Sequence, residues 1–99
     1  MENTDLLQTN FIINELISWR DIDGQILILD TSINESAHEL NQIGSYIFTE
    51  ISRETPLLKI KEALINTYQG QLDQQEIETD FFQYLNDLIV MKIITPKKL

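Results

Sequence analysis

The side chains of this chain that could take part in chemistry are one histidine and several carboxylates, because its 99 residues include no cysteine. His38 would need carboxylates alone to complete a metal site, and no compact ligand spacing surrounds it. Glu76, Glu78 and Asp80 fall in the first turns of a predicted helix, where the helix dipole favours negative charge. The sequence pairs no nucleophile with a base and has no phosphate-binding glycine loop. We therefore predict a protein that is not an enzyme and needs no metal or cofactor.

The charge of the chain disfavours a nucleic-acid partner. Sixteen Asp and Glu against seven Lys and Arg give a formal net charge of −9, which repels a phosphate backbone. The charge favours a neutral or basic partner instead, or it serves only solubility. No apolar run approaches the roughly 18 residues of a membrane span, and residues 1–10 fit neither a secretory signal nor a transit peptide. We expect one cytoplasmic domain that does not enter a membrane.

Three strands are predicted in the first half of the domain, after a loosely ordered arm at residues 1–10. They cover residues 17–20, 26–29 and 36–40. The second run is apolar without alternation, which is typical of a central strand. The third is a short edge strand, with His38 and Leu40 on one face and Ala37 and Glu39 on the other.

Three helices are predicted to follow the sheet. They start at Asn41, at Thr55 with Pro56, and at Asp73 with Glu76, each a recognised helix-start pattern. The last helix, over residues 74–91, is the most apolar, and one broad face carries Ile77, Phe81, Tyr84, Leu85 and Leu88. Phe82 and Ile89 form a neighbouring stripe, with Leu85 between the two. Because the core covers one stripe, the second is available either to the far edge of the core or to a ligand.

Three strands followed by three helices define an α+β fold of the winged helix-turn-helix-like kind. Its motifs are Trp19-Arg20, Asp23-Gly24, the apolar central strand, the junction with Leu40, Asn41 and Gly44, and the last-helix segment 80–88. In this order and spacing they resemble the coenzyme PQQ synthesis protein D family, the recognition elements for ribosomally synthesised and post-translationally modified peptides. The resemblance covers about residues 18–94, within a domain placed at 11–95 and followed by a short basic tail at 96–99. The chain departs from the family at His38, where an aromatic residue is common, and at Lys92, where glycine is usual.

The resemblance implies that the leader of a precursor peptide binds by β-augmentation, in a groove between the third strand and the last helix. The predicted edge strand and the second apolar stripe supply the two walls of such a groove. The implied contacts are the backbone of Ser36, Ala37, His38, Glu39 and Leu40, apolar pockets at Phe82, Leu85 and Ile89, and a polar contact at Asn86.

The family also implies a partner enzyme to which the module, acting as a peptide chaperone, presents the leader. Radical S-adenosylmethionine enzymes and lasso-peptide leader peptidases or cyclases both fit, and the sequence does not separate them. Two alternatives share the architecture: a winged-helix regulator and an adaptor for a folded protein. The regulator is disfavoured because residues 74–87 contain no Lys or Arg.

Overall fold

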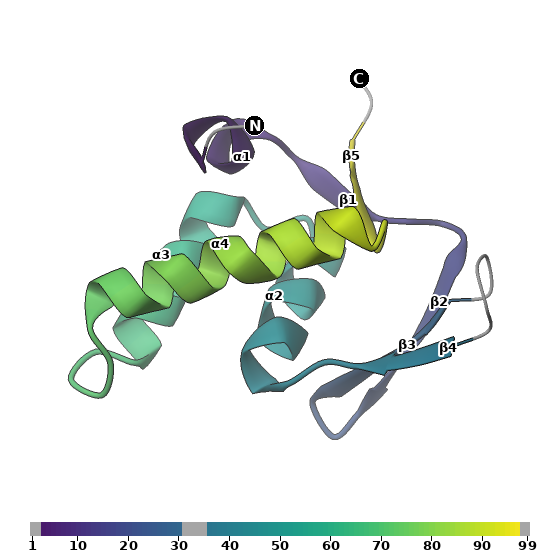
Figure 1. Cartoon of the computed structure of the whole chain (residues 1–99), viewed down its shortest axis with the longest axis horizontal. Helices are drawn as coiled ribbons and strands as arrows, with labels where there is room; N and C mark the ends of the chain where they lie inside the picture. The colour runs from purple at the N-terminus through teal and green to yellow at the C-terminus, as the bar shows by residue number, and fades with distance from the viewer. Residues whose placement is uncertain (1–2, 31–35, 98–99) are drawn as a thin grey trace.

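A three-stranded antiparallel sheet, with helices packed against its inner face, organises the computed structural model, which describes residues 3–30 and 36–97 (Figure 1). In chain order the elements are α1 (Asn3–Gln8), β1 (Phe11–Ile13), β2 (Ile17–Ile22), β3 (Gln25–Asp30), β4 (Ser36–Glu39), α2 (Gln42–Ser52), α3 (Leu57–Thr67), α4 (Gln74–Val90) and β5 (Ile94–Pro96). The predicted α+β plan of three strands followed by three helices is confirmed by β2 to β4 and α2 to α4.

The sheet has the order β2-β3-β4, so β3 is its central strand and β4 lies at an edge, as predicted. Trp19, Ile28 and His38 lie opposite one another across the three strands and share the inner face. Ile28 is fully buried there, and the Trp19 ring meets Phe48 of α2 edge-on, with centroids 4.9 Å apart. The apolar run of β3 is therefore explained by pairing on both sides and by α2 above one face.

The N-terminal segment differs from the predicted arm. Residues of α1 form a short helix that contacts α3, and Leu6 is buried. Beyond it, β1 pairs with β5 in a second, two-stranded antiparallel sheet, in which Phe11 lies opposite Pro96. The predicted tail thus begins inside a strand. Three-residue strands carry little local signal, because each depends on a partner from the other end of the chain.

Only the first of the three predicted helix caps forms through a side chain. The Asn41 Oδ1 atom accepts a hydrogen bond from the Gly44 N–H at 2.8 Å, which confirms that cap. The other two helices start within one residue of the predicted positions, but neither has a side-chain cap. Pro56 itself occupies the cap position of α3, so Thr55 lies outside it, and the Asp73 side chain makes no capping hydrogen bond at the start of α4.

The end of α4 is closed by a residue in the left-handed conformation, Lys92. The Ile93 N–H donates to the Leu88 carbonyl and the Lys92 N–H to the Ile89 carbonyl, a pairing that closes a helix through one left-handed residue. Lys92 is that residue, with φ of 60°. Because a side chain is strained in this conformation, we expect Lys92→Gly to raise the free energy of unfolding by about 1 kcal/mol. Urea denaturation of both proteins measures this, and an unchanged or lower value would contradict it.

Candidate functional site

The outer edge of β4 presents backbone groups that are free of the sheet. The Leu40 N–H donates to the Ile26 carbonyl at 2.9 Å, which makes these two residues a hydrogen-bonded pair. In an antiparallel ladder such pairs alternate with pairs whose N–H and C=O groups point outward. His38 therefore bonds inward to Ile28, whereas the backbone groups of Ala37 and Glu39 point away from β3. An extended peptide that lies along this edge could therefore form backbone hydrogen bonds with Ala37 and Glu39, in either antiparallel or parallel orientation.

Ser45 fixes the end of this edge strand. Its buried Oγ accepts from the Ile26 N–H at 2.9 Å and donates to the Leu40 carbonyl at 3.1 Å. One hydroxyl of α2 thus bridges β3 and β4 where their ladder stops. This role could not be predicted from the sequence, because a serine in the second turn of a helix gives no signal of a partner in a sheet.

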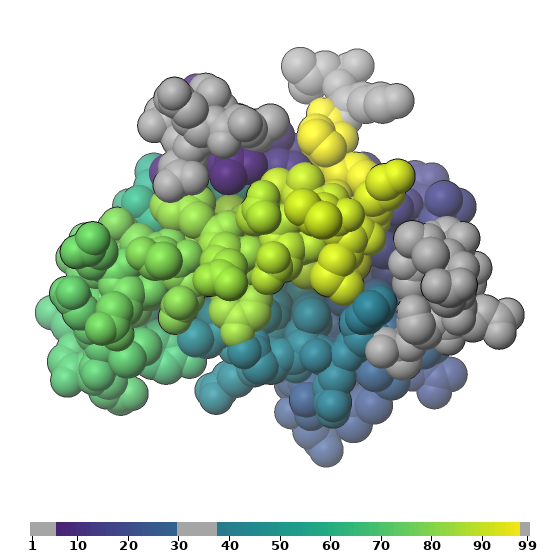
Figure 2. Space-filling view, viewed as in Figure 1, coloured from purple at the N-terminus to yellow at the C-terminus, as the bar shows by residue number. Residues whose placement is uncertain are grey.

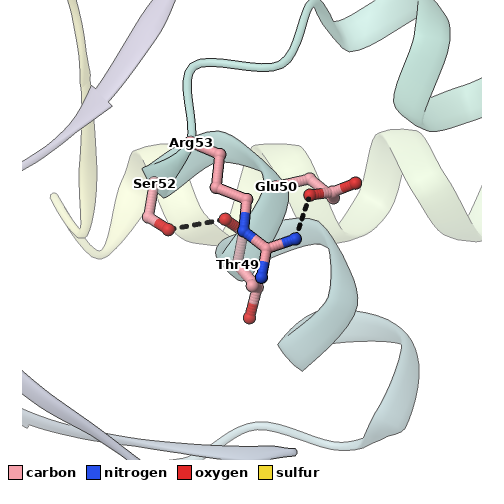
Figure 3. A network of polar contacts seen from close by, with 4 residues as sticks. All are labelled: Thr49, Glu50, Ser52 and Arg53. Carbon is pink, nitrogen blue, oxygen red and sulfur yellow. Dashed lines mark hydrogen bonds and ion pairs between the residues drawn. The ribbon is translucent and has the colours of Figure 1, made fainter.

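We expect Ser45→Ala to lower the free energy of unfolding by about 1–3 kcal/mol, because it leaves the buried Ile26 N–H without its acceptor. Ser52→Ala in the same helix is the matched control. The Ser52 hydroxyl donates to the Thr49 carbonyl (Figure 3), which also accepts from the Arg53 N–H, so no group is left unpaired. Chemical denaturation should show a loss at Ser45 that clearly exceeds the loss at Ser52. Equal losses would contradict the bridging role.

The start of α2 also connects to α4. The Asn41 Nδ2 atom donates a hydrogen bond to the Tyr84 hydroxyl, while Asn41 Oδ1 caps α2. Gly44 makes room for the ring, because a Cβ at this position would lie 3.3 Å from Tyr84 Cε1. The predicted helix start at Asn41 is therefore confirmed, and Gly44 allows the Tyr84 ring to pack closely. Tyr84 was predicted as a core residue and instead links α4 to the end of the edge strand.

Tyr84 identifies the side of α4 that faces the start of α2, directly after β4. It lines a shallow recess with Asp80, Gln83 and Asp87. Figure 2 shows α4 crossing this face of the molecule, with residues of β4 and α2 below it. Helical spacing places the half-buried Met91 on the same side, two turns beyond Tyr84. Because α4 contains no Lys or Arg, this wall is acidic and partly apolar.

The predicted apolar stripe lies on a different side of α4. At roughly 100° per residue, Phe82 and Ile89 are about 140–160° from Tyr84 around the helix axis. Glu78 lies on the same stripe, and its Oε1 atom is 3.9 Å from the Nζ atom of Lys61 in α3. The structure therefore turns this stripe toward α3 and does not bring it to the β4 edge.

Leu85 and Asn86 also lie away from the Tyr84 side of α4. Leu85 is 0% exposed and belongs to the core, so its side chain offers no pocket at the surface. Asn86 is exposed, but it lies about 160° from Tyr84. Of the predicted side chains, His38 and Leu40 lie half-buried on the inner face and Glu39 is exposed.

Among the described residues, no group of three or more His, Cys, Asp or Glu side chains could hold a metal ion. Within the same part of the chain, no helix is long and apolar enough to cross a membrane.

Comparison with known proteins identifies solved structures that share this fold. No protein-family model and no curated protein matches the sequence. Two solved structures resemble it over 88% of the chain. One is TbiB1 in complex with the TbiA(beta) leader peptide, with a TM-score of 0.74, 18% identity and 98% of that chain covered. The other is a lasso peptide synthetase B1 complexed with the leader peptide, with a TM-score of 0.72, 17% identity and 99% of that chain covered. The chain therefore has the fold of these B1 proteins over almost their whole length.

Proposed function

We propose that this chain is a recognition element for ribosomally synthesised and post-translationally modified peptides, similar to the coenzyme PQQ synthesis protein D family. It binds the leader of a precursor peptide as an extra strand on β4. The observation that carries the proposal is the free β4 edge, with outward backbone groups at Ala37 and Glu39, beside the Tyr84 side of α4. The fold likeness to two proteins whose structures hold leader peptides supports it.

The geometry suggests how a leader is held. Backbone hydrogen bonds to Ala37 and Glu39 fix its register, because they are the same for any sequence. Side chains on every second leader residue then point toward α4, where Tyr84, Asp87 and Met91 line the wall. Selectivity comes from these alternate positions. The acidic wall and the net charge of −9 favour a leader that is neutral or basic.

The bound leader is presented to a modifying enzyme, and the module itself performs no catalysis. A lasso-peptide leader peptidase or cyclase is the partner that the fold likeness favours. A radical S-adenosylmethionine enzyme remains the second partner class, on the family resemblance. Binding at an edge strand suits a module that binds the peptide while another protein modifies it. Only the segment paired with β4 is covered, and the rest of the peptide stays accessible to the enzyme.

The test first reads the neighbouring genes for a short precursor peptide, and then titrates the isotope-labelled chain with a synthetic leader from that precursor. We expect the amide resonances of Ala37 and Glu39 to shift strongly together with those of Tyr84 and Asp87, because these groups line the two walls. A scrambled peptide of the same composition is the control. Shifts confined to the β2 edge, or equal shifts with the scrambled peptide, would contradict the proposed site.

A further inference from the structure

One pair of side chains joins the end of the edge strand to the last helix. Asn41 directly follows Leu40, the last residue bonded to β3, and its Nδ2 atom donates to the Tyr84 hydroxyl. Among the side chains of residues 6–29 and 38–97, no other hydrogen bond connects α4 with the segment from β4 to α2. The relative position of these two walls therefore depends on this contact and on packing.

The contact is held at both ends. Asn41 cannot turn away without losing the cap of α2, because its Oδ1 atom accepts from the Gly44 N–H. The Tyr84 ring lies against Gly44, where a Cβ would lie 3.3 Å from Cε1 and 3.2 Å from Asn41 Oδ1. Cap, ring and hydrogen bond thus form one unit, which we call the Asn41–Tyr84 latch.

We infer that the Asn41–Tyr84 latch is a positioning device that sets the spacing between β4 and α4 and thereby the affinity for the leader. This inference rests on the proposed function. An added strand must bond to β4 while its inward side chains fit against α4, so both walls must already be correctly spaced. A latch that keeps them in place removes an ordering cost that would otherwise be subtracted from the binding free energy.

Three single variants separate the latch from the helix cap. Asn, Asp and Ser are about equally good caps. N41D keeps the cap and lets the Tyr84 hydroxyl donate to a carboxylate, so the contact reverses direction but persists. N41S keeps the cap with a side chain too short to reach Tyr84. Y84F keeps the ring on Gly44 and removes the hydroxyl. All three should unfold at similar urea concentrations, because each retains the cap and the packing.

Calorimetric titration with the same synthetic leader gives the expected pattern. N41S and Y84F should bind about 5- to 10-fold more weakly than the unchanged chain, and N41D within about 3-fold of it. N41S/Y84F should be no weaker than either single variant, because both remove the same contact. Without leader, N41S and Y84F should each shift the Glu39 amide resonance more than N41D does, because N41D keeps the contact with Tyr84.

The outcomes distinguish this inference from the proposed function. If the unchanged chain does not bind the leader, the proposed function fails and the inference fails with it. If the unchanged chain binds and N41S and Y84F bind equally well, only the latch is contradicted. Additive losses in N41S/Y84F would also contradict it, because they would show that the two side chains act separately.

Discussion

Glu39→Pro should weaken leader binding about 100-fold and leave the fold intact. The Glu39 N–H points outward from β4, so its removal deletes no hydrogen bond of the sheet. Proline is tolerated on edge strands for this reason, and its restriction of the preceding residue to extended backbone suits a strand. For leader binding, the same change removes the N–H that would donate to the leader backbone, and the proline ring blocks the approach of the leader strand. Calorimetric titration with the synthetic leader measures the loss.

Two variants control this result. Glu39→Gln removes the charge and keeps the N–H, and it should bind within about 3-fold of the unchanged chain, because an exposed charge contributes little. His38→Pro removes an N–H that points toward Ile28, so it should destabilise the sheet itself. If Glu39→Pro folds and binds as tightly as Glu39→Gln, the leader does not pair with β4.

The edge strand could be predicted because its signals are local. The apolar run of β3 and the short alternating segment that ends at Leu40 indicate a central and an edge strand without knowledge of the rest of the chain. Asn41 was recognised as a cap for the same reason, since a cap concerns only one helical turn. The β1–β5 pair could not be predicted, because Phe11 and Pro96 are 85 residues apart in sequence and each strand is too short to be recognised alone.

The helical wall could be predicted only in part. Periodicity shows that α4 has two apolar stripes, but it does not show which stripe faces which neighbour. The answer comes from contacts between elements: Tyr84 with Asn41 on one side, and Glu78 with Lys61 on the other. These contacts show that Tyr84 faces Asn41 and that the stripe of Phe82 and Ile89 faces α3. The groove between β4 and α4 stays a prediction from the resemblance, and the Tyr84 side of α4 is the wall that we propose for it.

Leu85→Ala should lower the free energy of unfolding by about 2–5 kcal/mol, the usual cost of a cavity left by a buried leucine. Leu85 is 0% exposed, at the middle of the α4 face that packs into the core. Val90→Ala is the control in the same helix. Its side chain is 69% exposed, so its loss should change stability by less than about 0.5 kcal/mol. Chemical denaturation compares the two.

The same pair of variants tests where Leu85 acts. A core residue contributes to leader binding only by keeping the chain folded. Under conditions where Leu85→Ala is still folded, its affinity for the leader should therefore stay within about 3-fold of the unchanged chain. A groove residue would behave in the opposite way, with a large loss of affinity and little loss of stability. That second pattern would return Leu85 to the binding surface, and it would require α4 to rotate about its axis when the leader binds.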